Sequence, residues 1–69
     1  MSIDLILIAT NKVREHFPDL DISDIYDPIG FSEYVDFDAY DGRTIRYDLE
    51  NDSLLEFDAD GYISRGIKL

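Results

Sequence analysis

Hydrophobic residues recur at intervals of three and four near the start of the chain, which is the spacing of one helix face. Ser2 can cap the first free amides, and Pro18 ends the helix because a residue before proline is disfavoured in helical geometry. A strand over residues 3–8 is the rival, but the charged residues 12–16 do not fit it. We therefore predict a helix over 3–17, whose buried face is formed by Leu5, Ile6, Ala9, Val13, His16 and Phe17.

Residues 18–30 lack a clear period and carry four aspartates and two prolines. We interpret this segment as a connection whose hydrophobic side chains Leu20, Ile22 and Ile25 contact the core while its aspartates face water. A short irregular strand or a helical turn in this segment stays an open alternative.

From residue 31 onward, hydrophobic and polar residues alternate, which is typical of antiparallel strands with one buried and one exposed face. Turn signals at 41–42, 51–52 and 60–61 divide this region into four strands. The predicted inward side chains are Val35, Phe37, Ala39, Ile45, Tyr47, Leu49, Leu55, Phe57 and Ile63.

Loop length decides which side chains face each other, since a one-residue slip turns every side chain to the other face. A three-residue loop at 40–42 sets Phe37 opposite Ile45 and Asp36 opposite Arg46, and it needs a left-handed glycine. The same loop at 59–61 sets Phe57 opposite Ile63. The predicted fold is α+β, with one domain over 1–69 in which an N-terminal helix packs on a four-stranded antiparallel meander over 31–69.

Charge is the strongest feature of the composition. The chain has sixteen acidic and six basic residues, which gives a formal charge of −10. It has no cysteine and only one histidine. Such a surface repels nucleic acid and anionic lipid, so we expect neither as a direct partner. The first residues lack the basic segment and the cleavage site of a signal peptide, so we expect a cytoplasmic protein. We also expect a monomer or a weak dimer.

Catalytic and metal-binding interpretations find little support. Residues Glu56, Asp58, Asp60, Gly61, Ile63 and Ser64 match part of a calcium loop, but Ile67 stands where the bidentate glutamate is required. His16 has no second histidine to complete a metal site, so we expect it to cap the helix or to pack at the core edge. Paired carboxylates on an open sheet offer no evident concave pocket. We expect no enzyme, no cofactor and no metal.

Fifteen of the sixteen acidic residues fall into two runs, over 15–42 and 47–64, and neither run contains a lysine or an arginine. Several aspartates lie within the predicted strands, where this residue is disfavoured. We therefore predict a rigid acidic surface that binds a basic groove of a partner protein. Its predicted residues are Asp19, Asp21, Asp24 and Asp27 from the connection, and Asp36, Asp38, Asp41, Asp48 and Glu50 from the sheet.

In size, acidity and helix-plus-meander pattern, the whole chain resembles phage-encoded inhibitors of bacterial defence, such as anti-CRISPR and anti-restriction DNA mimics. That resemblance implies stoichiometric blocking of a nucleic-acid-binding surface without catalysis. A second one covers residues 35–63, where 45–58 resembles the hairpins of PepSY-type domains, which are usually exported and regulatory. The alternative function is a protein-interaction or oligomerisation module, of immunity or PepSY-like type. It would use an apolar patch such as 62–69, with Tyr62 and Ile67, and its acidity would serve solubility.

Overall fold

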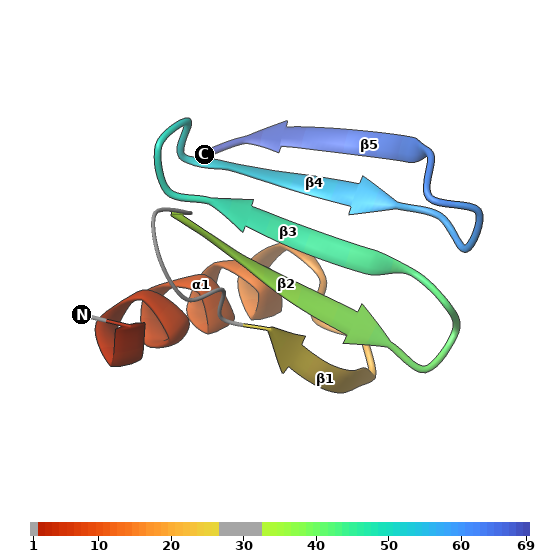
Figure 1. Cartoon of the computed structure of the whole chain (residues 1–69), viewed down its shortest axis with the longest axis horizontal. Helices are drawn as coiled ribbons and strands as arrows, with labels where there is room; N and C mark the ends of the chain where they lie inside the picture. Colours follow the sequence, from red (N-terminus) through yellow and green to blue (C-terminus); the bar gives the residue numbers. More distant parts are fainter. Residues whose placement is uncertain (1, 27–32) are drawn as a thin grey trace.

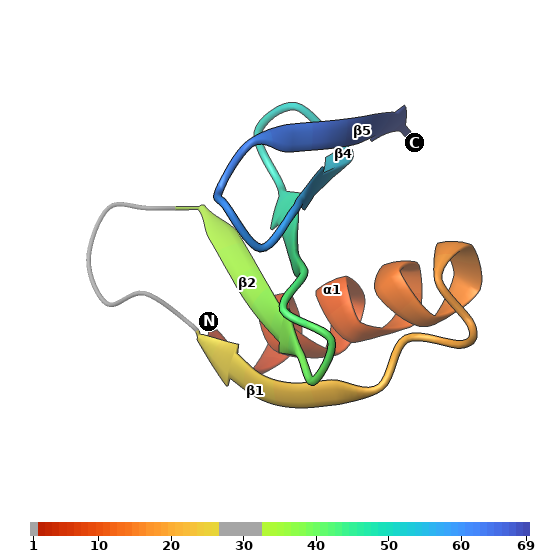
Figure 2. The same cartoon turned by 90° about the vertical axis from the view of Figure 1, so that its right-hand side faces the viewer.

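A computed structural model describes residues 2–26 and 33–69, with one helix on one face of an antiparallel sheet (Figures 1 and 2). Helix α1 spans Ser2–His16, which confirms the predicted helix to within one residue at each end. Its Ala9 and Val13 are fully buried, and Phe17 follows them into the core just after the helix ends. His16 lies in the last turn and is exposed rather than packed at the core edge.

Over residues 2–26 and 33–69, the sheet contains five strands in the order β1-β2-β3-β4-β5, so the predicted number of four is too small. The strands are β1 (Ile22–Tyr26), β2 (Tyr34–Ala39), β3 (Thr44–Asp48), β4 (Ser53–Phe57) and β5 (Ile63–Lys68). Each strand pairs antiparallel with the next along the chain. The α+β class and the meander topology are confirmed.

The additional strand β1 lies within the segment predicted as a connection. Ile22 pairs with Ala39 and Ile25 pairs with Phe37, so the two isoleucines share a face although they are three residues apart. A register shift between Ile22 and Asp24 supplies the extra residue. This bulge hides the two-residue period that marks a strand, which is why the pattern alone did not identify β1.

The β2–β3 hairpin has the predicted register. Phe37 lies opposite Ile45 and Asp36 lies opposite Arg46, while Gly42 has a φ of 97°. The left-handed region accepts glycine at little cost, so this residue suits the predicted three-residue loop. Phe57 also lies opposite Ile63, as predicted, with a register shift next to that pair.

Strand β4 is turned over relative to the prediction. Asp48 pairs with Ser53, so the β3–β4 loop holds four residues, among which Asp52 has a φ of 47°. This even length brings Leu54 and Glu56 to the side of the helix and sends Leu55 and Phe57 to the opposite side. The prediction that Leu55 and Phe57 face the core is wrong, because adjacent leucines satisfy the hydrophobic pattern in either register.

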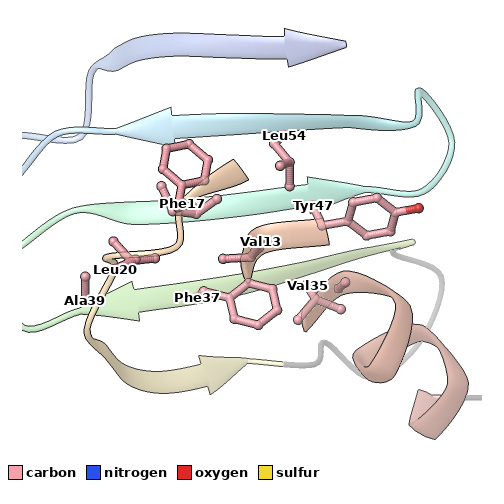
Figure 3. Close-up of a cluster of buried hydrophobic side chains, with 10 residues drawn as sticks. Val13, Phe17, Leu20, Val35, Phe37, Ala39, Tyr47 and Leu54 are labelled. Atoms are coloured by element: carbon pink, nitrogen blue, oxygen red, sulfur yellow. The ribbon is translucent and has the colours of Figure 1, made fainter. Parts of the chain in front are cut away.

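The core lies between α1 and the sheet, with the helix packed on β2 and β3 (Figure 3). Leu49 and Ile63, predicted to face inward, are instead 42% and 61% exposed. Directly opposite residues on neighbouring strands share a face, so the other side of the sheet, here called the outer face, follows from the register. In the described strands it carries Asp24, Tyr26, Tyr34, Asp36, Asp38, Thr44, Arg46, Asp48, Ser53, Leu55, Phe57, Ile63, Gly66 and Lys68. The buried core residues are Ala9, Val13, Phe17, Leu20, Val35, Phe37, Ala39, Ile45, Tyr47 and Leu54.

Candidate acidic binding surface

Asp36 lies near the centre of the outer face and forms an ion pair with Arg46. The guanidinium Nε and Nη2 donate to the two carboxylate oxygens at 2.8 and 3.1 Å. The same guanidinium lies 4.2 Å from the ring centroid of Tyr34 and 5.4 Å from that of Phe57. The Asp36 carboxylate raises the pKa of Arg46. The charge of this predicted site residue is therefore neutralised within the protein.

Asp41 is neutralised as well, at the end of a chain of ion pairs on the other side of the sheet. Arg43 donates to Asp41 at 2.8 Å and to Glu56 at 3.2 Å. Arg65 contacts Glu56 at 3.4 Å and lies 4.6 Å from the ring centroid of Phe17. The backbone amide of Arg43 donates to the Asp41 carboxylate and lowers its pKa.

Sequence reasoning missed this ion-pair chain because it placed Glu56 on the wrong side of β4. With the observed register, Glu56 lies on the helix-facing side between two arginines, and its side chain is only 14% exposed. The parity of the β3–β4 loop was the signal that would have placed it there. These ion pairs, with the contact of Arg65 on Phe17, connect the end of the helix to β3, β4 and β5, which is a structural role.

Asp48 and Glu50 lie at the β3–β4 loop, at the other end of the strands. The backbone amide and side-chain amide of Asn51 donate to the Asp48 carboxylate at 3.3 and 2.7 Å. The backbone amide of Leu49 donates to the carbonyl of Glu33 at 2.9 Å, which draws Glu33 towards the same loop. With Asp52 of the same loop, four acidic residues therefore lie at this end of the sheet, and the described residues provide no ion pair for any of them.

Asp24 and Asp38 face each other across β1 and β2 on the outer face. Asp24 accepts the backbone amide of Ile25 at 2.9 Å, and Asp38 accepts the hydroxyl of Thr44 at 3.0 Å. Neither carboxylate has a cationic partner within the described residues. Like charges directly opposite each other are destabilising. The Asp24 carboxylate also raises the pKa of the exposed Tyr26.

The remaining predicted residues extend the acidic surface along β1. Asp19 and Asp21 are exposed and directly precede this strand, and the backbone amide of Tyr40 donates to the carbonyl of Asp21 at 3.0 Å. Asp27 lies outside the described residues. The structure thus brings together Asp21, Asp24 and Asp38 at one end of the sheet and Asp48 and Glu50 at the other.

The hairpin with the calcium-like spacing is held by its own hydrogen bonds. One carboxylate oxygen of Asp58 accepts the backbone amides of Asp60 and Tyr62 at 3.0 and 2.9 Å. In the part of the chain that the structure describes, no three His, Asp or Glu side chains are grouped to hold a metal ion. Over the same residues, no helix combines the length and apolar character that a membrane span requires.

Comparisons of the chain with protein-family models, with curated proteins and with solved structures find no match.

Proposed function

We propose that this protein is a small acidic module without catalytic activity that binds a basic, nucleic-acid-binding surface of a partner protein. Among the eight described residues of the predicted surface, only Asp36 and Asp41 have ion-pair partners. Six carboxylates stay available: those of Asp19, Asp21, Asp24, Asp38, Asp48 and Glu50. This uneven neutralisation is the observation that carries the proposal, because it leaves negative charge where a cationic partner can reach it.

The acidic residues at the two ends of the sheet, represented by Asp38 and Asp48, have a separation that suits partial mimicry of DNA. Asp38 and Tyr34 are four residues apart on β2, and Tyr34 pairs with Asp48. At ~3.3 Å per residue, the groups lie about 13 Å apart. The major groove of B-DNA, which is bordered by phosphate rows, is ~12 Å wide. Inhibition of a defence system in a host cytoplasm, as by anti-CRISPR or anti-restriction proteins, is the specific form of the proposal.

Displacement by DNA tests the proposal. The immobilised protein is incubated with a bacterial lysate at ~0.1 M salt, and bound proteins are released either with duplex DNA or at ~1 M salt, where the screening length falls from ~10 to ~3 Å. We expect both treatments to release the same basic proteins. Retention that neither treatment changes would contradict the proposal.

Two matched variants localise the contact. Asp24→Asn/Asp38→Asn removes two charges but keeps a carbonyl oxygen for the hydrogen bonds that both side chains accept. Glu15→Gln/Asp60→Asn removes two exposed charges elsewhere. We expect the first variant to lose capture and the second to retain it. Equal loss in both would mean that net charge, rather than this surface, determines binding.

An interaction module that uses an apolar patch is the second candidate, and the exposure of the β5 hairpin favours it. Tyr62 and Ile63 are 73% and 61% exposed, and β5 is an edge strand. Ile67, by contrast, packs against the core, so its replacement would disturb the fold. Under this alternative, Ile63→Asp abolishes partner binding while Asp24→Asn/Asp38→Asn leaves it intact.

A further inference from the structure

The outer face contains a complete site for a guanidinium group. Arg46 on β3 lies opposite Asp36 on β2, which it contacts at 2.8 and 3.1 Å, and it lies over the ring of Tyr34, two residues before Asp36. One carboxylate and one aromatic ring on a strand thus hold an arginine from the next strand, and the ring of Phe57 on β4 lies 5.4 Å from the same guanidinium. Charge-assisted hydrogen bonds and a cation–π contact act together in this arrangement.

The edge strand β1 repeats two of these three parts. Asp24 lies opposite Asp38 and Tyr26 lies opposite Asp36, so the step from Asp24 to Tyr26 runs in the same direction as the step from Asp36 to Tyr34. Tyr26 is 52% exposed, and neither Asp24 nor Asp38 has a cationic partner in the described residues. The pair of side chains that holds Arg46 therefore recurs one strand further out, where no strand supplies an arginine.

The position of β1 in the sheet determines what could complete this site. Among the described strands, β1 is hydrogen-bonded only to β2 and lies at the edge of the sheet (Figure 2). An edge strand presents unpaired backbone N–H and C=O groups that an extended segment can use. Edge strand β5 differs from β1 because it carries Arg65 and Lys68, so the two edges have opposite charge preferences.

We propose that β1 binds an extended basic segment of the partner as a sixth antiparallel strand, with an arginine or lysine opposite Asp24 and packed against Tyr26. The proposal rests on the proposed function, because it assigns a binding mode to the same basic partner. A second copy of this chain is a poor occupant, since each copy carries a formal charge of −10.

Synthetic peptides test the edge directly. The probe is a capped eight-residue peptide that alternates arginine and valine, and its affinity is measured by fluorescence anisotropy at ~0.1 M salt. A peptide of the same composition with its arginines in one block is the charge control. Two further probes carry N-methyl groups on the arginine amides or on the valine amides. Only one of these two sets faces β1 in an added strand.

We expect the alternating peptide to bind roughly tenfold more tightly than the block peptide, and one of the two methylated peptides to lose roughly tenfold. Asp24→Asn/Tyr26→Ala should weaken binding of the alternating peptide about fivefold or more. Asp60→Asn/Tyr62→Ala makes the same chemical change at the same spacing on an exposed turn and should leave it unchanged. Circular dichroism confirms that both variants fold, and amide exchange should slow in Ile22–Tyr26.

The contrary outcomes separate this inference from the proposed function. Equal, salt-sensitive affinities for all four peptides would overturn the added strand but would support binding of basic chains by charge. Absence of binding by every peptide would overturn the added strand, while DNA displacement still decides the proposed function. Slower amide exchange in β5 (Ile63–Lys68) instead of β1 (Ile22–Tyr26) would place the peptide at β5 and overturn the proposal. Self-association that Asp24→Asn/Tyr26→Ala removes would make a second copy the occupant.

Discussion

The two adjacent leucines of β4 give the sharpest test of the sheet register. Leu54 is fully buried in the core, whereas Leu55 lies on the outer face, opposite Gly66 of β5. The two residues have the same chemistry and lie on the same strand. Truncation of each to alanine therefore measures the difference between the two faces with little contribution from local propensity.

The expected difference is large for a domain of this size. Burial at Leu54 places Leu54→Ala in the range of 2–5 kcal/mol that is typical of buried leucines, with about 3 kcal/mol as the central expectation. Leu55→Ala removes a partly exposed side chain and should cost about 1 kcal/mol. At roughly 0.05–0.15 kcal/mol per residue, a chain of 69 residues has a total stability of about 3–10 kcal/mol. Leu54→Ala thus removes a substantial share of the free energy of unfolding.

Urea unfolding followed by circular dichroism measures both variants. With a denaturant slope near ~1 kcal/mol/M, the Leu54→Ala midpoint should fall by about 3 M and the Leu55→Ala midpoint by about 1 M. If Leu54→Ala does not fold, the pair Leu54→Val and Leu55→Val keeps the comparison, with about 1 kcal/mol expected for the loss of one buried methylene. Equal losses at the two positions, or a larger loss at Leu55, would refute the four-residue loop and the assignment of faces.

Three further predictions follow from the turns and the ion pairs. Gly42→Ala should destabilise the fold by about 1 kcal/mol or more in thermal melts, because φ is 97° and the new Cβ would lie 3.2 Å from a neighbouring side chain. Asp41→Asn should reduce acid sensitivity: the Arg43 amide lowers the Asp41 pKa, so this stabilisation is present above the unfolded value of ~3.9 and is lost as pH falls through the folded pKa. Melts from pH 2 to 7 should show the wild type losing more stability than the variant. A double-mutant cycle of Arg46→Gln and Asp36→Asn should give a coupling free energy of unfolding of about 1 kcal/mol at low salt. A coupling near zero would show that the ion pair makes no net contribution to stability.

Local signals predicted the parts of the fold that depend on neighbouring residues. The helix ends where Pro18 dictates, and the three-residue loop with Gly42 sets the register of β2 and β3. Two features were not predicted, namely strand β1 and the orientation of β4. Both depend on loop or bulge residues that decide which face of the sheet the following side chains occupy. The bulge before Asp24 masked β1, and the four-residue loop before Ser53 turned β4 over.

The sequence could predict which acidic residues form the candidate surface, but not all of the ion pairs that neutralise some of them. The sequence placed Arg46 opposite Asp36, and the structure confirms that contact. The ion pair of Asp41 with Arg43 is a local contact between residues two apart, which the turn interpretation did not consider. The pairing of Glu56 with Arg43 and Arg65 is long-range and depends on the register of β4.

Neutralisation by position connects the stability of this protein with its proposed binding. Three of its arginines are bound to Asp36, Asp41 and Glu56, all within or beside β2, β3 and β4, where the sheet is paired on both sides. Asp24 and Asp38 lie opposite each other without a cationic partner in the described residues, so their like-charge repulsion weakens the pairing of β1 with β2. Under the proposed binding mode, an arginine or lysine of the partner placed opposite Asp24 would relieve that repulsion and add its own attraction, so the same two carboxylates that destabilise the free protein would favour binding.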